Sequence, residues 1–526
     1  MCLGQLTIYN NGKEIMMKKV KYIALSLLTL GMVACENELV EDLRDRNNND
    51  NGPLPELTAG SVDFSNYVAI GASFTAGFTD NALFMASQEN SFPNIMASKF
   101  ENVGGGTFNQ PMMNDNFGGL AVGGMRITDP RLVFGGAGPV PLEAVVGPVT
   151  VSTDIALNNP TGPFNNLGIP GAKSFHLVAP GYGNLANFPA AANPYAVRVT
   201  GNAPNATILE LAMAQNPTFF SLSEVGGNDV LGYALSGGDG TNPITDTATF
   251  NASLSALVAG LTSTGAKGVI GNLPNITSLS HFTTVPHNPV PLDAATAGFL
   301  NSASAYGAYN AGVAQALAGL VQFGQITQEM ADAELAKRTI TFSAGEGNAV
   351  VIMDENLIDL TGLNPALVSM RQATAEDLIV LPASSFIGTE EVPGNPQTVN
   401  GVAIPLADKW VLTPEEQQEI ADATAAYNAT ISSVAATNNL ALVDLNSILD
   451  QAATTGIMFD DYNMNTDLVF GGLVSLDGVH LTARGYALMA NSFLQAIDAT
   501  YGSNFEASGN LAKAGNYPTN YSPALQ

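Results

Sequence analysis

The chain has 526 residues, of which 46% are hydrophobic, enough for a large core in one elaborated domain or two ordinary ones. Its 53 glycines and 29 prolines predict many turns and long loops. The 18 basic and 46 acidic residues give a net charge of −28. That sign is wrong for a nucleic-acid-binding protein and for adsorption of the folded surface to anionic lipid, so we expect no nucleic-acid partner.

The N-terminus has the pattern of an export signal. A basic segment at residues 16–21 precedes an apolar run, 22–33, that is too short to span a membrane as a helix. The run leads into MVAC at residues 32–35, which resembles the bacterial lipobox, where the cysteine is lipidated and becomes the new N-terminus. We expect residues 1–34 to be a signal peptide, with a natural start at residue 16 or 17. The alternative is a plain signal peptide in which Cys35 is incidental.

A lipid on Cys35 implies that the membrane is a partner. The protein is then expected in the cell envelope as an outer-membrane lipoprotein, facing the periplasm or the cell surface. Cys2 and Cys35 are the two cysteines of the chain, so neither a disulfide framework nor a cysteine nucleophile is available in the folded body. Residues 35–58 are acidic and rich in asparagine and proline, which predicts a flexible tether.

The folded body is expected from residue 59 to 505, followed by a C-terminal tail at 506–526. Short apolar runs predict buried strands at residues 67–70, 217–223, 268–270 and 440–444. Apolar spacing and capping signals predict helices at residues 206–215, 247–262, 413–437 and 482–500. Alternating strands and helices argue for an α/β fold with a parallel sheet in a three-layer sandwich.

Two long stretches interrupt this alternation. Residues from about 104 to 165 are rich in glycine, proline and asparagine without sustained periodicity, which predicts long loops or a lid-like insertion. Residues from about 281 to 408 form a second insertion, of mixed character and with no clear repeat. The predicted alternation of helices and strands resumes at Thr413, where an N-cap threonine precedes a proline and a capping-box glutamate.

A serine stands on the loop that leaves the first strand, in the sequence GASFTAG at residues 71–77. Open α/β sheets bind their ligands at the carboxyl ends of strands, and small neighbours let a substrate carbonyl approach the Ser73 hydroxyl. A serine hydroxyl needs a base that takes its proton, and the base needs a group that orients it. The other interpretation of this stretch is an ordinary strand-to-loop turn.

The candidate base is His480. It is the histidine, of four in the chain, that has a carboxylate at short spacing in a turn that opens a helix: Asp477-Gly478-Val479-His480. The Asp477 carboxylate can fold back onto one imidazole nitrogen and leave the other for Ser73. The alternative is a surface histidine in a helix-start turn that Asp477 caps.

An oxyanion needs hydrogen-bond donors. Asn228 follows two glycines at the end of a predicted strand, in GGND at residues 226–229. The sequence NLGIPGA at residues 166–172 offers the unobstructed backbone N–H of Gly171, with Gly168 as the alternative. Each of these two motifs is common in ordinary turns when it occurs alone.

Taken in order, these four pieces resemble the four sequence blocks of the SGNH (GDSL) hydrolase family. The resemblance covers most of the body from about residue 62 to 502, apart from the two insertions. It implies a flavodoxin-like sandwich in which Ser73 is the nucleophile, His480 the base and Asp477 its orienting partner. The N–H groups of Ser73 and Gly171 and the Asn228 side chain would then form the oxyanion hole. The family's usual Asp and Leu around the serine are Ala72 and Phe74 here, which argues for lower efficiency rather than another mechanism.

The resemblance implies a lipid-anchored serine esterase that hydrolyses acyl or acetyl esters through an acyl-enzyme, with no cofactor. Its expected partner is a small-molecule or glycan ester, and apolar stretches in the insertions favour an acyl substrate slightly. The alternative function is a surface lipoprotein of the same fold that is weakly active or inactive and binds glycan or protein. We expect no metal: the alternating Asp461, Asn463, Asn465 and Asp467 lack the turn glycine and the bidentate glutamate of a calcium loop.

Overall fold

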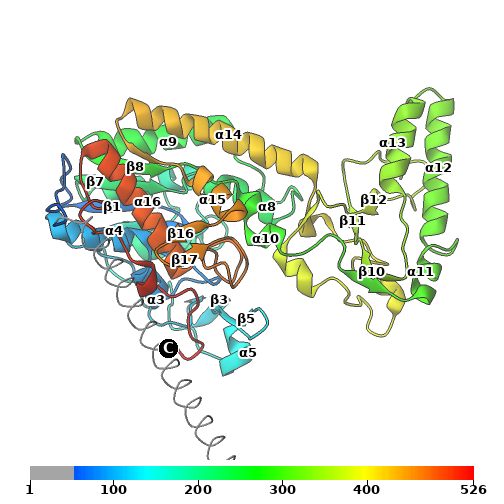
Figure 1. The fold of residues 1–526 in the computed structure, drawn as a ribbon, viewed down its shortest axis with the longest axis horizontal. Coiled ribbons are helices and arrows are strands. Elements are labelled where there is room, and N and C mark those ends of the chain that lie inside the picture. The colour runs from blue at the N-terminus through cyan, green and yellow to red at the C-terminus, as the bar shows by residue number, and fades with distance from the viewer. Residues whose placement is uncertain (1–52) are drawn as a thin grey trace, which may run out of the picture. The chain divides into compact units, whose positions relative to one another are not determined.

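The computed structural model describes residues 53–526. The signal peptide, Cys35 and most of the tether therefore lie outside the described residues. Residues 57–506 and 510–526 form one compact unit, which is the part that carries the sheet, the helices and both insertions (Figure 1). Within residues 53–526, no helix combines the length and the apolar character that crossing a membrane requires.

Five parallel strands form the central sheet, in the spatial order β15-β8-β7-β1-β6. Their bounds are β1 (Tyr67–Gly71), β6 (Asn166–Gly168), β7 (Phe219–Ser223), β8 (Lys267–Gly271) and β15 (Ala441–Val443). Numbered along the chain, the order is 2-1-3-4-5, which is the flavodoxin-like order of doubly wound sheets. All residues of β1 and β7 are buried, as expected for central strands covered on both faces.

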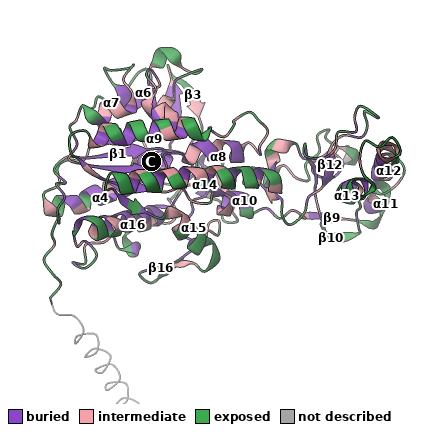
Figure 2. Ribbon diagram, turned by 90° about the horizontal axis from the view of Figure 1, so that it is seen from above, coloured by how far each residue is buried: buried purple, intermediate pink, exposed green. Residues whose placement is uncertain are grey.

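Helices cover both faces of this sheet (Figures 1 and 2). On one face, α4 (Phe92–Phe100) packs against α16 (Ala483–Tyr501). On the other, α9 (Thr247–Thr262) lies between α7 (Ile208–Met213) and α14 (Pro414–Thr437). The structure therefore confirms an α/β sandwich with a parallel sheet.

The long predicted helices have the expected bounds because their ends carry strong local signals. The Thr413 hydroxyl accepts from the Glu416 N–H, and the Glu416 carboxylate accepts from the Thr413 N–H at 2.7 Å, which makes the expected capping box of α14. Helix α9 spans the predicted residues, with Asp246 as its N-cap. The shorter elements shift by one to two residues, as helix α7 does at both ends.

The first insertion is more regular than the sequence predicts. It contains β2 (Leu120–Val122), β3 (Met125–Thr128), β4 (Leu132–Phe134), β5 (Pro139–Pro141) and α5 (Leu142–Val146). The strands pair as two antiparallel hairpins, β2 with β3 and β4 with β5. The expectation of long loops was wrong for these segments, because strands of three or four residues are too short to show a period in the sequence.

The second insertion contributes its buried side chains to the same hydrophobic core cluster as the main body. Its helices are α10 (Ser280–Thr283), α11 (Ala294–Leu300), α12 (Tyr306–Gln322) and α13 (Gln328–Arg338). Its strands are β9 (Val290–Leu292), β10 (Gly345–Asn348), β11 (Val351–Met353), β12 (Met370–Gln372) and β13 (Leu378–Ile379), and β13 pairs with β14 (Val411–Leu412). Buried arginines hold the irregular segments: Arg371 binds Asp354 at 2.6 Å and Asp377 at 2.7 Å.

The remaining elements are α2 (Ser73–Ala76), α3 (Met85–Glu89), α6 (Pro194–Thr200), α8 (Gly227–Leu235), α15 (Leu445–Thr454), β16 (Ile457–Phe459) and β17 (Tyr462–Met464). The C-terminal residues from 510 on pack against the body. The Asn491 side chain bonds the backbone of Ala512 at both its N–H and its C=O, and the Tyr521 ring lies edge-on to Phe84 at 4.9 Å between centroids. The last residues are therefore part of the folded unit.

Candidate active site

The candidate nucleophile stands on a tight turn at the carboxyl end of β1. Ser73 is the first residue of the one-turn helix α2, which Gly77 ends with a φ of 86°. A Cβ at Gly71 would lie 2.1 Å from the Thr75 hydroxyl and 2.4 Å from the Ser223 carbonyl, so only glycine fits between β1 and this turn. Ser73 is 7% exposed and borders a cavity.

Asp477 and His480 form the pair that the sequence predicts. Nδ1 of His480 lies 2.9 Å from Oδ2 of Asp477, and Oδ1 of Asp477 accepts the backbone N–H groups of Val479 and His480 at 2.9 and 2.8 Å. Burial alone would raise the pKa of Asp477, but the His480 charge and these hydrogen bonds hold it well below its usual range. The carboxylate is therefore ionised and orients the imidazole.

The loop after Ser73 is bonded directly to the loop that carries this pair. Thr79 donates its hydroxyl to the Leu481 carbonyl at 2.9 Å, and the Asn81 N–H donates to Oδ2 of Asp477 at 2.8 Å. These residues are about 400 positions apart in the chain, 402 and 396 respectively. The two loops that the sequence predicts to meet are thus joined by hydrogen bonds.

Aromatic rings pack on the imidazole from the serine side. The Phe74 ring lies edge-on to His480 at 5.7 Å between centroids, and Phe78 lies at 4.6 Å. Phe74 follows Ser73 directly, so a ring of the serine turn itself contacts the histidine. Among the described residues, no hydrogen bond joins the Ser73 hydroxyl to the His480 ring. Such bonds are often long in unliganded enzymes and shorten when substrate is bound.

Asn228 lies in the same site. Gly226 precedes it with a φ of 105° and opens helix α8, and Asn228 borders the cavity together with Ser73. One amide hydrogen of Asn228 is donated to the Ala172 carbonyl at 2.9 Å, which ties the GGND turn to the glycine segment and leaves its second hydrogen for a ligand. Asp229 anchors the same segment, because its carboxylate accepts hydrogen bonds from the N–H and the hydroxyl of Ser174, both at 2.7 Å. The sequence did not reveal this role of Asp229.

Gly171 and Gly168, the two candidate oxyanion donors that the sequence left open, have different surroundings in the structure. Ala172 donates to the Ile169 carbonyl across Pro170-Gly171, and Gly171 has a φ of 79°, the signature of a type II turn. The N–H of Gly168 is already donated to the Asn166 side chain at 3.0 Å. A Cβ at Gly168 would lie 2.3 Å from the Ala76 nitrogen, so Gly168 lets the strand approach the serine turn. Within the described residues the Gly171 N–H has no hydrogen-bond partner, so Gly171 stays a candidate oxyanion donor.

Glu224, which the sequence analysis missed, reaches under the serine turn from the end of β7. It is partly buried, borders the cavity, and accepts backbone N–H groups from that turn. Burial raises its pKa to about 8, although the hydrogen bonds from Phe74, Thr75 and Ala72 oppose this. A charged residue at the end of a buried strand, two positions before GGND, was the available signal.

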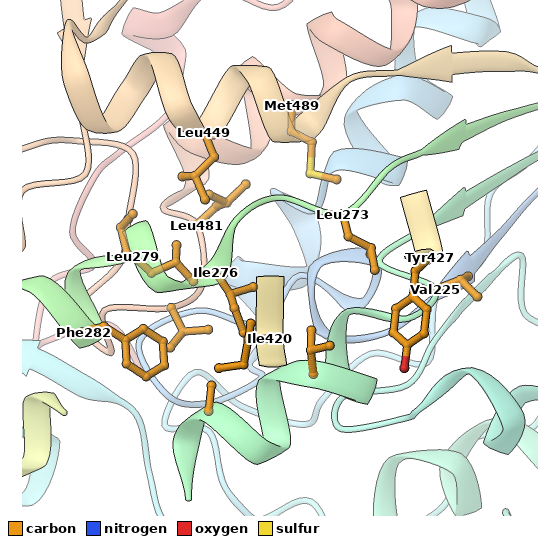
Figure 3. Close-up of a cluster of buried hydrophobic side chains, with 14 of the residues drawn as sticks. Val225, Leu273, Ile276, Leu279, Phe282, Ile420, Tyr427, Leu449, Leu481 and Met489 are labelled. Carbon is orange, nitrogen blue, oxygen red and sulfur yellow. The ribbon is translucent and has the colours of Figure 1, made fainter. Parts of the chain in front are cut away.

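The cavity beside Ser73 has a volume of about 100 Å³ and is walled mainly by aliphatic side chains. Figure 3 shows several of these side chains pointing toward one another from the β8 loop, α15 and α16. Those that both line the cavity and are labelled there are Leu273, Ile276, Leu279, Leu449, Leu481 and Met489. A polar edge with Ser73 and Asn228 and an apolar interior suit an ester whose acyl part is hydrocarbon.

The second insertion contacts the turn that carries Asp477 and His480. The His281 N–H, at the start of α10, donates to the Gly478 carbonyl at 2.9 Å. A Cβ at Gly478 would lie 2.8 Å from the His281 nitrogen, and the φ of Gly478 is 77°. Burial lowers the pKa of His281, and its ring borders Asp477 through the backbone carbonyl only, at 3.4 Å. His281 therefore supports the turn through its backbone N–H.

Metal-ligand groups are gathered at one place in the described residues, away from this cavity. Carboxylate oxygens of Glu355, Asp408 and Glu416 lie within 4.8 Å of one another, and none of the three residues lines the cavity beside Ser73. Burial and mutual repulsion raise the pKa of Asp408 to about 7 and that of Glu416 to about 8. Acidic groups of this kind are common without an ion.

Comparisons with protein-family models, with curated proteins and with solved structures found no match for this chain.

Proposed function

We propose that this protein is a serine esterase that hydrolyses carboxylic esters with a short apolar acyl group. The observation that carries the proposal is the joined pair of loops at the carboxyl edge of the sheet. One loop presents Ser73, and the other presents the bonded Asp477–His480 pair. Cavities at this edge are where doubly wound folds bind their ligands.

The chemistry follows from these groups. The Ser73 oxygen attacks the ester carbonyl carbon while Nε2 of His480 takes the hydroxyl proton, and Asp477 stabilises the imidazolium. The carbonyl oxygen becomes an oxyanion beside the N–H groups of Ser73 and Gly171 and the second amide hydrogen of Asn228.

Collapse of this intermediate breaks the bond to the leaving alcohol, which receives the proton from His480 and leaves an acyl-serine. A water molecule then gives its proton to His480 and attacks the acyl carbon, and the same donors hold the second oxyanion. Breakdown releases the carboxylic acid and returns the proton to the serine. Ser73 and Asn228 border the cavity, and His480 lies between Val479 and Leu481, which are part of its wall.

The acyl group is assigned from the cavity. Its volume of about 100 Å³ is smaller than the roughly 150 Å³ apolar cavity that takes up benzene. A butyryl-sized chain is therefore expected to fill it better than an acetyl group does.

The family and the location are further parts of the proposal. The order of the four motifs supports membership of the SGNH (GDSL) hydrolase family. The lipobox-like MVAC at residues 32–35 supports a lipid anchor on Cys35 in the cell envelope. Mass spectrometry of the N-terminus after expression in a Gram-negative host tests the anchor, and a mature chain that begins elsewhere than Cys35 would contradict it.

The activity is tested with a fluorophosphonate, which reacts only with an activated serine. Protein that begins after Cys35 is incubated with the probe and examined by intact mass, beside Ser73→Ala and His480→Ala. Ser433→Ala, which changes an exposed serine on α14, is the matched control. We expect one adduct on the wild type and the control and none on the two site variants.

A second candidate function is favoured by a separate cavity of about 1070 Å³ in the second insertion. Its walls include the exposed Phe299 and parts of Tyr306 and Tyr309. A surface lipoprotein that binds a glycan or a protein segment there would need no catalytic serine. Absence of any adduct on folded wild-type protein would favour this function over hydrolysis.

A further inference from the structure

Glu224 is a partly buried carboxylate that hydrogen-bonds the serine turn. It follows β7 directly, and its backbone adopts a φ of 50°, the left-handed region that is uncommon for a residue with a Cβ. This conformation directs the side chain toward the neighbouring strand β1 rather than along its own strand. A strained backbone that delivers one carboxylate to one turn is a feature typical of functional sites.

The carboxylate binds three backbone N–H groups of the serine turn. Oε1 accepts from Ala72 at 3.2 Å and from Phe74 at 2.7 Å, and Oε2 accepts from Thr75 at 3.1 Å. The Thr75 hydroxyl adds a fourth donor at 3.3 Å. Within the described residues, the Ser73 N–H lies between these donors and has no hydrogen-bond partner.

We propose that Glu224 is a positioning residue that clamps the residues on either side of Ser73, so that the Ser73 N–H alone is left for the oxyanion. This inference rests on the proposed esterase function. Glu224 occupies the N–H groups of positions 72, 74 and 75, which would otherwise need water at the edge of the cavity. The clamp fixes both the hydroxyl and the N–H of the same residue, which electrostatic preorganisation requires.

The ionised form of Glu224 is the form that holds the clamp, because both oxygens then accept hydrogen bonds. Its burial raises its pKa to about 8, so the clamp strengthens as the pH rises through that value. The other titratable groups that face the turn are Tyr486 of α16 and the Asp477–His480 pair. Burial and the nearby Glu224 and Asp477 charges hold the pKa of Tyr486 well above 10, so its hydroxyl stays neutral.

The test compares the wild type with Glu224→Gln. Glutamine has the same shape but one acceptor oxygen, and its NH₂ group would face backbone donors. Glu224→Asp keeps the charge on a shorter side chain and serves as the second variant. Asp154→Asn is the matched control, because Asp154 likewise accepts N–H groups from a loop, those of Gly123 and Gly124, outside the cavity.

The first readout is amide hydrogen exchange, which does not depend on activity. At pH 9 we expect faster exchange in Glu224→Gln over residues 67–80 and no change there in Asp154→Asn. Unchanged exchange over residues 67–80 would overturn the clamp, whether or not the protein is an esterase.

The second readout is ester hydrolysis with the kcat and KM separated. At pH 9 the kcat of Glu224→Gln is expected to fall about 100-fold with little change in KM, the size of effect that losing one oxyanion donor has. At lower pH the difference in kcat between the wild type and Glu224→Gln becomes smaller, because Glu224 of the wild type takes up a proton. The kcat of Glu224→Asp is expected to lie between those of the wild type and Glu224→Gln. A merely structural glutamate would lower the melting temperature and leave kcat unaltered.

The outcomes separate the two proposals. Faster exchange with wild-type kcat at pH 9 would overturn the positioning role while leaving the esterase in place. A wild type that neither hydrolyses esters nor takes the fluorophosphonate would end the esterase proposal and the catalytic role of Glu224 with it. Hydrogen exchange would then still decide whether the carboxylate clamps the turn.

Discussion

Asp477 spreads its two oxygens over donors from two loops. Oδ1 binds the N–H groups of Val479 and His480, while Oδ2 is shared between the His480 ring and the Asn81 N–H. The first set shapes the turn that presents the imidazole, and the second joins that turn to the serine loop. The single residue therefore serves both the geometry and the charge of the site.

Asp477→Asn is expected to keep the turn and lose the function of the base. An amide still accepts at Oδ1 but offers N–H hydrogens toward Nδ1 of His480, so the wrong tautomer is favoured and kcat falls by about 10⁴-fold. Hydrolysis of a butyrate ester measures this. The control is Asp246→Asn, which changes the N-cap of α9. A kcat of Asp477→Asn equal to that of the control would contradict the assigned role.

Glu224 makes the stability of the protein depend on pH. Its pKa rises from an ordinary 4.5 to about 8 in the folded chain, chiefly through burial. Between these values the folded protein holds a proton that the unfolded chain has released, so the free energy of unfolding falls as the pH rises and levels off above about 8. Urea unfolding from about pH 5 to about pH 9 should show a steeper decline in the wild type than in Glu224→Gln, which lacks this carboxyl group. An equal decline in both proteins would contradict this.

At the scale of elements, the serine turn is held by close packing as well as by hydrogen bonds. Helix α2 is a single turn, too short to be stable alone, and lies against β6. Gly168 makes this contact possible, because its missing side chain leaves room for the backbone of Thr75 and Ala76. The turn therefore depends on the strand beside it.

Gly168→Ala is expected to push α2 away from β6. The added Cβ would lie 2.3 Å from the Ala76 nitrogen, and overpacking of this kind costs about 1–3 kcal/mol. We expect lower stability in urea together with lower activity, because the turn carries Ser73. Gly265→Ala is the control: its φ is 86° but a Cβ there meets no atom within 4 Å, so stability alone should fall. Full activity of Gly168→Ala would contradict the close contact.

At the scale of the whole molecule, the apolar cavity exists because several distant elements meet over the carboxyl edge of the sheet. Leu273 follows β8, Leu449 comes from α15 and Met489 from α16. The walls are hydrocarbon and Ser73 lies at the edge. In the proposed esterase, this cavity would favour substrates by the apolar area that they bury.

The acyl preference is expected to follow from this burial. Each buried CH₂ group contributes about 0.8 kcal/mol, so a butyrate ester should exceed an acetate ester in kcat/KM by about tenfold. Leu449→Phe, which fills the cavity, should remove most of this advantage. Leu442→Phe, at an exposed leucine of β15, is the control. A preference for acetate in the wild type would instead support deacetylation.

Much of the framework could be predicted from the sequence because the signals are local. The capping box at Thr413 and the apolar spacing of residues 247–262 lie within single helices, and the structure has these helices with the same bounds. The contact between Asp477 and His480 also spans only three residues. The hairpins in the first insertion were not predicted, because their strands are stabilised by pairing with each other and carry no recognisable pattern in the sequence.

The sequence by itself determined four of the five sheet strands, the four predicted helices and the pairing of Asp477 with His480, since these depend on neighbours along the chain; it did not predict β6. Only the tertiary structure decided which partners the serine turn has. Glu224 reaches Ala72, Phe74 and Thr75 from 149 to 152 positions away. The close contact between Gly168 of β6 and helix α2 is likewise a tertiary contact. In a parallel sheet, adjacent strands are joined by long crossovers, so contacts at its carboxyl edge leave no periodicity in the sequence.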